Sequence, residues 1–222
     1  MAVSSTFDRD YFAANYANYQ RQNPARKLAF YRHLIEPAAT CDRPAKLLEI
    51  GCAFGGFLAS LDDRWRCWGL DVSDYAIEQA RLAAPTATLA VASGARIPFA
   101  ETFDCVAAFD VIEHIQDLEQ VADGVFRHLR PGGYFVFVVP VYDGPTGPII
   151  HALDRDPTHL HKRSRQFWID WLTGRFELVD WHGVYRYLLP LGYYVHLPTR
   201  RFRRFTPAIA VVARRPLESS AT

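Results

Sequence analysis

The sequence predicts an α/β fold, built as a doubly wound sheet with helices on both faces. Short apolar runs alternate with stretches of helical spacing, and uninterrupted apolarity is typical of parallel strands that are covered on both faces. The first run ends in a glycine-rich turn at residues 51–56, which is where such folds pass from a strand into a helix beside a ligand. Both observations place a ligand site at the carboxyl edge of the predicted sheet.

Seven strands are expected, joined by helical crossovers. The predicted strands are residues 46–50, 66–71, 87–92, 103–109, 133–139, 176–184 and 207–213. The predicted helices between them are residues 55–62, 74–84, 116–129 and 164–174. Asp74 can cap the second helix through its side-chain oxygen, and Pro131-Gly132-Gly133 stops the third.

The N-terminal stretch, residues 1–37, does not belong to the predicted sheet. Asn23-Pro24 is a good cap and first-turn pair for a helix that reaches Glu36. Phe12, Tyr16 and Tyr19 recur at helical spacing just before it. We keep two interpretations of this aromatic stripe: a lid over the cofactor, with Tyr16 or Tyr19 facing the substrate, or an amphipathic helix that packs on the sheet.

Composition is consistent with one domain over residues 1–222, long enough to bury a sizeable core. A formal net charge of +1 argues against a strong general attraction to nucleic acid. Cys41, Cys52, Cys67 and Cys105 form no C-x-x-C pair, which fits a reducing compartment. The N-terminus lacks a basic start with an apolar core, and no apolar run has the roughly 20 residues that a membrane helix needs. We therefore expect a cytoplasmic chain that binds neither nucleic acid nor membranes.

The glycine-rich turn indicates a ligand that contains adenosine. Asp71 ends the second predicted strand about twenty residues after Gly51, the spacing at which an acidic side chain reaches a ribose. Ala53 puts a methyl group where a pyrophosphate needs a bare backbone. Glu49 places a carboxylate close to the turn, which favours a cationic ligand over a diphosphate. A positively charged adenosine compound, S-adenosylmethionine, fits these residues better than a nicotinamide dinucleotide.

Further motifs follow in a fixed order along residues 45–140. The segments are 49–55, Asp71, 97–99, 103–115 and 129–133. In this order they resemble the class I S-adenosylmethionine-dependent methyltransferases, in particular the small-molecule group whose first motif is E/D-x-G-x-G-x-G. The chain departs from that pattern twice, because Ala53 replaces the middle glycine and Ser93-Gly94-Ala95 stands where the family often has an acidic residue near the adenine. The second departure puts the adenine contact in doubt.

The resemblance implies a seven-stranded Rossmann-like sheet whose last strand is antiparallel, with S-adenosyl-L-methionine as the cofactor. It implies in-line transfer of a methyl group to oxygen, nitrogen or carbon of a small molecule, compatible with natural-product or sugar metabolism. Asp71 is expected to hold the ribose, and the turn to offer its backbone to the methionine part. The expected cofactor contacts are Glu49, Gly51, Cys52, Ala53, Gly55, Asp71, Val72, Ser93, Gly94, Ala95, Phe109 and Asp110.

Histidines supply the candidate proton acceptors near neutral pH. His114 follows the fourth strand at the carboxyl edge of the sheet, and His159 and His161 lie in the loop after the fifth strand. We expect His114 or His159 to be the catalytic base and His161 to contact substrate; bracing of the following helix and hydrogen bonding within the loop are the structural alternatives. The spacing of these histidines is not diagnostic of a metal, and we expect no metal site.

Residues 185–205 form a basic, aromatic insertion between the last two predicted strands. The segment contains five arginines and no acidic residue. Arg200 and Arg203 are expected to bind an acidic acceptor, with a solvated surface or a subunit contact of a homodimer as the alternative.

Three other functions stay open. A short-chain oxidoreductase with NAD(P) needs a Tyr-x-x-x-Lys pair, and no tyrosine here has a lysine four positions on. A methyltransferase acting on exocyclic amines of nucleic-acid bases would resemble its family in an N/D-P-P-Y/F loop, where this chain has residues 110–113 as Asp-Val-Ile-Glu. A domain that binds the cofactor without catalysis is compatible with both departures from the family pattern.

Overall fold

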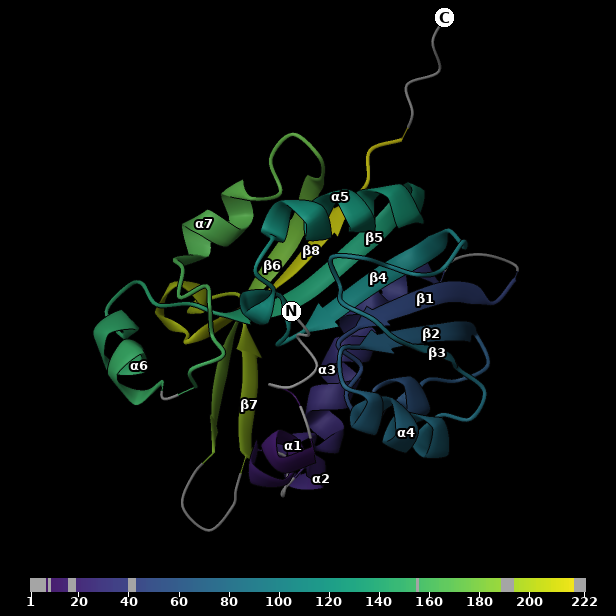
Figure 1. The fold of residues 1–222 in the computed structure, drawn as a ribbon. Helices are drawn as coiled ribbons and strands as arrows, with labels where there is room; N and C mark the ends of the chain where they lie inside the picture. Colours follow the sequence, from purple (N-terminus) through teal and green to yellow (C-terminus); the bar gives the residue numbers. More distant parts are fainter. Residues whose placement is uncertain are drawn as a thin grey trace, which may run out of the picture.

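The computed structural model describes residues 7, 9–15, 19–39, 43–154, 156–188 and 194–217. These residues form one eight-stranded sheet with the strand order β3-β2-β1-β4-β5-β8-β6-β7 (Figure 1). The strands are β1 (Ala45–Ile50), β2 (Trp65–Asp71), β3 (Thr88–Val91), β4 (Phe103–Phe109), β5 (Leu129–Pro140), β6 (Glu177–Leu188), β7 (Tyr194–Thr199) and β8 (Ala208–Arg214). The predicted fold class is confirmed.

The strand order reverses direction between β1 and β4. β1 pairs in parallel with β2 on one side and with β4 on the other, so the chain runs outward to β3 and then returns to the opposite side of β1. Such a reversal leaves a crevice at the carboxyl ends of the two central strands, where doubly wound proteins hold their ligands.

The carboxyl-terminal part of the sheet is antiparallel. β8 runs between β5 and β6 and pairs antiparallel with both, as expected for the last strand. The prediction of seven strands was one too few, because the expected insertion contributes β7, which pairs antiparallel with β6 from Gly183 to Leu188. β7 was missed because it has no continuous apolar run: histidine, proline and threonine interrupt it, and Leu197 and Pro198 are exposed.

Helices cover both faces of the sheet and bury two separate apolar clusters. The helices are α1 (Arg9–Asn15), α2 (Tyr19–Gln22), α3 (Ala25–Ile35), α4 (Asp74–Ala83), α5 (Leu118–His128), α6 (Gly147–Leu153) and α7 (Arg165–Asp170). One cluster joins the sheet to α5 and α7, where Trp168 is fully buried. The other joins it to α3 and α4 through residues such as Tyr31 and Ile77. None of the helices in the described part of the chain has both the length and the apolarity to cross a membrane.

Helix ends differ from the predictions in three places. Residues 55–62 form only a short 3-10 turn, Leu58–Ser60, and the left-handed backbone of Gly55 prevents a helix from beginning at residue 55. α4 is capped by Ser73, whose Oγ accepts from the Ala76 amide at 3.3 Å, and Asp74 is its first helical residue. Asn23 does not cap α3; its amide donates to the Tyr19 carbonyl at 2.9 Å.

Candidate active site

A cavity of about 550 Å³ opens at the carboxyl ends of β1, β2 and β4, at the reversal of strand order. The ends of these strands form its floor, and α3 together with the N-terminal helices forms one wall. Most of the residues expected from the sequence to contact the cofactor line it. These are Glu49, Gly51, Cys52, Ala53, Asp71, Val72, Ser93, Gly94, Ala95, Phe109 and Asp110.

The turn after β1 is held in a fixed shape by its own backbone. Gly51, Ala53 and Gly55 all have positive φ, at 70°, 45° and 72°, and a Cβ on Gly51 would lie 2.2 Å from a methyl carbon of Val111. The amides of Gly51 and Cys52 both donate to the Leu70 carbonyl, at 2.7 and 3.0 Å. These amides are therefore engaged within the protein, and the turn does not present them to a diphosphate.

Glu49 is a buried carboxylate at the floor of the cavity. Its side chain is 4% exposed, and its Oε2 has no hydrogen-bond partner among the described residues. Burial, with the negative charge of Asp71 beside it, raises the pKa of Glu49 well above its usual value, while Lys27 opposes the shift. A cationic group in the cavity would satisfy this carboxylate, whereas a phosphate would be repelled.

Asp71, at the end of β2, ties the turn to the next strand. One of its oxygens accepts from the Ala53 amide and the other from the Ser73 amide, both at 3.0 Å. Burial raises the pKa of this carboxyl, and the two backbone donors oppose the shift. Each oxygen keeps a second lone pair, so Asp71 can hold the turn and still accept from a ribose hydroxyl.

An ion pair between Asp110 and Arg186 lies in the wall of the cavity at the end of β4. Asp110 follows β4 and has a φ of 60°, and Arg186 reaches it from β6. The cation holds the pKa of Asp110 below its usual value even though burial opposes this. Lys27 enters the same wall from α3, and burial lowers the pKa of its ammonium.

The N-terminal helices cover the open side of the turn. The Tyr19 hydroxyl accepts from the Gly56 amide at 3.1 Å, and the Tyr19 and Phe12 rings lie 5.0 and 5.1 Å from Phe54. Tyr19 therefore lines the cavity. Tyr16 falls outside the described residues.

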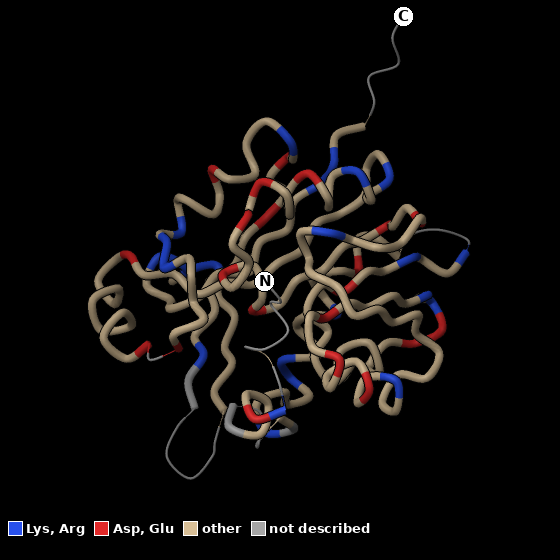
Figure 2. Tube along the Cα trace, viewed as in Figure 1, with Lys and Arg blue, Asp and Glu red and all other residues tan. Residues whose placement is uncertain are grey.

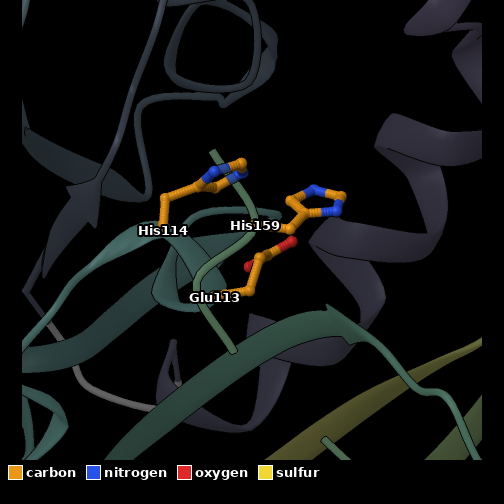
Figure 3. Close-up of side chains that lie close together, drawn as sticks. All are labelled: Glu113, His114 and His159. Atoms are coloured by element: carbon orange, nitrogen blue, oxygen red, sulfur yellow. The ribbon is translucent and has the colours of Figure 1, made fainter. Parts of the chain in front are cut away.

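Glu113, His114 and His159 come together on the remaining wall (Figure 3). One potential ligand atom of each lies within 4.8 Å of the others. Glu113 is 1% exposed, and neither of its oxygens has a hydrogen-bond partner among the described residues. Burial, with the charge of Asp110, raises the pKa of Glu113 well above its usual value.

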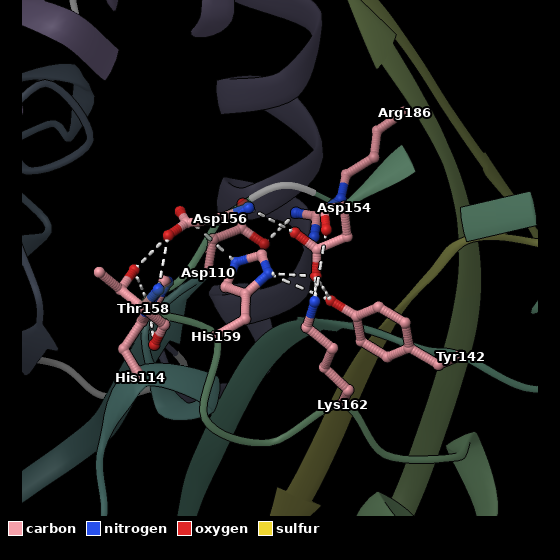
Figure 4. A network of polar contacts seen from close by, with 9 residues as sticks. All are labelled: Asp110, His114, Tyr142, Asp154, Asp156, Thr158, His159, Lys162 and Arg186. Atoms are coloured by element: carbon pink, nitrogen blue, oxygen red, sulfur yellow. Dashed lines mark hydrogen bonds and ion pairs between the residues drawn. The ribbon is translucent and has the colours of Figure 1, made fainter. Parts of the chain in front are cut away.

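Both histidines are oriented by a hydrogen bond at Nδ1 of the ring (Figure 4). Nδ1 of His114 lies 3.0 Å from the Thr158 carbonyl oxygen. Nδ1 of His159 lies 2.8 Å from Oδ2 of Asp154, which also accepts from the Tyr142 hydroxyl. A carbonyl or carboxylate oxygen only accepts, so each Nδ1 carries the proton and each Nε2 keeps its lone pair.

Four predicted site residues do not line the cavity. Gly55 packs instead on α4, where a Cβ would lie 3.1 Å from that of Ala80. Nε2 of His161 bonds to the Ile115 carbonyl at 2.9 Å. Arg200 pairs with Asp180, and Arg203 stacks on Trp181 with 4.0 Å between its guanidinium carbon and the ring centroid. The basic stretch that contains both arginines lies at the α6 end of the molecule, away from the turn (Figure 2).

Sequence reasoning did not assign Lys27, Glu113 or Arg186 to the site. Arg186 is one of the five arginines of residues 185–205, but the sequence did not single it out. The pairing of β6 in the sheet brings it to Asp110. Glu113 lies beside His114 in the sequence. Its place just after the fourth strand, at the carboxyl edge of the sheet, was the signal that could have identified it. Lys27 carries no local signal, since a single lysine in a helix is usually exposed.

Comparison with known proteins now agrees with the geometry. A family model described as a methyltransferase domain matches residues 18–181. The chain belongs to this methyltransferase family. A probable S-adenosylmethionine-dependent methyltransferase of Mycolicibacterium smegmatis is 34% identical over 165 residues, which are 70% of this chain and 62% of the relative. A trans-aconitate 2-methyltransferase of Azoarcus is 31% identical over 119 residues, 52% of this chain and 46% of that protein. The methyltransferase domain thus spans less than two thirds of the length of either relative.

Solved structures share the fold of the methyltransferase domain. A putative methyltransferase of Bacillus halodurans superposes with a TM-score of 0.66 at 14% identity and covers 86% of this chain and 100% of its own. The N-methyltransferase NodS of Bradyrhizobium japonicum, in complex with S-adenosyl-L-homocysteine, gives 0.60 at 20% identity, with 86% and 87% coverage. At these identities the likeness concerns the fold alone.

Proposed function

We propose that this methyltransferase domain binds S-adenosylmethionine in the cavity and transfers its methyl group to a small molecule. The observation that carries the proposal is Glu49, a buried carboxylate with an unpaired oxygen beside a turn whose amides are already bonded. A buried carboxylate beside engaged amides favours a positively charged ligand that contains adenosine, and it disfavours a diphosphate. Cavities of this size are typical of small-molecule sites.

The residues divide the cavity into two ends. Asp71 would hold the ribose hydroxyls, with Ser93, Gly94 and Ala95 beside the base, and Glu49 would receive the amino group of the methionine part. Lys27, buried and close to Glu49, would hold the methionine carboxylate or an acidic acceptor. When bound, the cofactor supplies a methyl group that its sulfonium already activates.

The wall of Glu113, His114 and His159 would hold the acceptor. The domain would then act mainly by positioning the nucleophile of the acceptor, which can lower the reaction barrier by roughly 7–11 kcal/mol. An acceptor that reacts through a hydroxyl or an ammonium also loses a proton, and the free Nε2 of His114 or His159 would take it. The N-terminal helices with Tyr19 would close the site as a lid and exclude water.

Our second proposal is that the methyl acceptor is acidic. The residues that would bind it differ from those expected from the sequence. Arg200 and Arg203 lie outside the cavity, but Lys27 and Arg186 line it. The Azoarcus relative is named for trans-aconitate, an acidic acceptor. Substitution Lys27→Met should therefore raise KM for an acidic acceptor steeply, whereas Arg200→Ala should leave it unchanged.

Transfer is tested with S-adenosylmethionine that carries a deuterated methyl group. The wild-type chain, incubated with a small-molecule extract, should give products heavier by one CD3 group in mass spectrometry. The Glu49→Gln variant should give far less product at the same cofactor concentration. Tight cofactor binding without any labelled product would instead favour a domain that binds without catalysis.

A further inference from the structure

The cluster of Glu113, His114 and His159 has the composition of a metal centre. Two imidazoles and one carboxylate on one side of an ion, with the other positions open, are a common arrangement for divalent first-row metals. His114 and His159 lie 45 positions apart in the sequence, and the loop after β5 brings them together (Figure 3).

The lone pairs that a metal needs are available on both rings. Nδ1 of His114 donates to the Thr158 carbonyl, and Nδ1 of His159 donates to Asp154. Hydrogen bonds of this kind fix the orientation and the tautomer of metal-binding histidines in known sites. The two ring centroids are 4.7 Å apart, which is compatible with two nitrogens bound to one ion.

Asp154, which orients His159, is itself held in place by several polar contacts. Asp154 accepts from His159 and from the Tyr142 hydroxyl, at 2.8 and 2.5 Å, and pairs with Lys162 at 3.0 Å (Figure 4). The Asp154 oxygen that faces Nδ1 of His159 also accepts the Tyr142 proton, so Nδ1 of His159 is the donor and carries the proton.

Glu113 supplies the independent observation that points to a cation. It is 1% exposed, and both of its oxygens lack a hydrogen-bond partner among the described residues. Leaving a buried polar group unsatisfied destabilises the folded protein, and more so for a charged group. An ion bound between Glu113 and the two imidazoles removes that cost.

We infer that Glu113, His114 and His159 bind one divalent first-row metal ion in the wall of the cavity. Only the role of the ion rests on the proposed function. The open positions of the ion would face the acceptor end of the cavity and take an oxygen or nitrogen of the acceptor. In that state the imidazoles serve as ligands and neither acts as a free base. The metal site itself does not depend on what the cavity binds.

Mn²⁺ is the probe for a direct test. Protein dialysed against a chelator and then against buffer is titrated with Mn²⁺ by calorimetry, and bound Mn²⁺ is counted by electron paramagnetic resonance. We expect one equivalent per chain. The Glu113→Gln and His159→Gln variants should each bind at least ten times more weakly.

His151→Gln is the matched control, because His151 lies on α6 in the same region, is exposed and is outside the cavity. It should bind Mn²⁺ like the wild type. Circular dichroism and a titration with S-adenosylhomocysteine, both on metal-free protein, check that each variant folds and that the proposed cofactor site is intact.

The outcomes separate the two proposals. Wild-type protein that binds S-adenosylhomocysteine but no Mn²⁺ overturns the metal site and leaves the proposed function standing. Mn²⁺ bound equally well by all variants would mean an ion held elsewhere, and also overturns it. Mn²⁺ binding without S-adenosylhomocysteine binding would support the metal site and contradict the proposed function.

Discussion

Replacing Glu49 with glutamine should make the folded protein more stable and its cofactor site weaker. The wild-type carboxylate is 4% exposed, has an oxygen without a partner among the described residues, and lies beside Asp71. An amide of the same shape removes the buried charge. Substitutions that relieve a destabilised functional site typically gain about 0.5–2 kcal/mol, which is a rise in Tm of roughly 2–4 °C per kcal/mol for a chain of this size.

The stability gain should depend on pH. Because burial raises the pKa of Glu49, the folded wild-type chain keeps a proton there at pH values where the unfolded chain has lost it. Its free energy of unfolding therefore falls as pH rises through the raised pKa, and the Glu49→Gln variant lacks this fall. The difference between the two proteins should be larger at pH 8 than at pH 4.

Cofactor affinity should change in the opposite direction. A charged hydrogen bond to the ligand contributes about 1.5–3 kcal/mol, so Glu49→Gln should weaken S-adenosylmethionine about ten- to 150-fold. Calorimetry in two buffers of different ionisation enthalpy should also show proton release on binding to the wild type, and less release with the variant. Glu78→Gln, on the exposed side of α4, is the matched control for both measurements.

The reasoning would be refuted by a Glu49→Gln variant that is no more stable than the wild type at pH 8 and binds the cofactor equally well. In that case Glu49 is satisfied by a group that the cavity already provides, and the charge of the ligand is not what the site selects.

Three further predictions concern the frame of the cavity. Asp71→Asn should weaken S-adenosylmethionine about tenfold or more in calorimetry, because it loses a charged acceptor that also holds the turn, while Asp74→Asn, three residues on and exposed, should bind normally. Gly51→Ala should lower the free energy of unfolding by roughly 2–4 kcal/mol in urea titrations, since its Cβ meets Val111 in a left-handed backbone; an unchanged midpoint would show that the turn can relax. A double-mutant cycle with Asp110→Asn and Arg186→Gln should give a coupling energy of roughly 1–3 kcal/mol, and strictly additive effects would argue against the pair.

The sheet and the cofactor turn could be predicted because their signals are local. The run before Gly51 is mostly apolar, and Asp71 follows at a fixed spacing, so sequence distance translates directly into geometry. β7 escaped prediction because its identity as a strand depends on pairing with β6 and not on its own hydrophobic pattern. Strand character at such positions is set by neighbours in space.

The acceptor end could be predicted only in part. His114 and His159 were both predicted as candidate bases from their places after the fourth and fifth strands. Their contact with each other and the ion pair of Asp110 with Arg186 could not be predicted, because they join residues 45 and 76 positions apart in the sequence. The arginines of the basic segment misled because their partners lie on another strand: Arg200 pairs with Asp180 and Arg203 stacks on Trp181, both on β6 and outside the cavity.

Calorimetric titration of the purified chain with S-adenosylhomocysteine, and separately with NADH, decides which cofactor the cavity binds. We expect one S-adenosylhomocysteine site per chain, weakened about tenfold or more by Asp71→Asn, and no measurable binding of NADH. Tight binding of NADH together with no binding of S-adenosylhomocysteine would contradict the cofactor that the turn, Glu49 and Asp71 indicate.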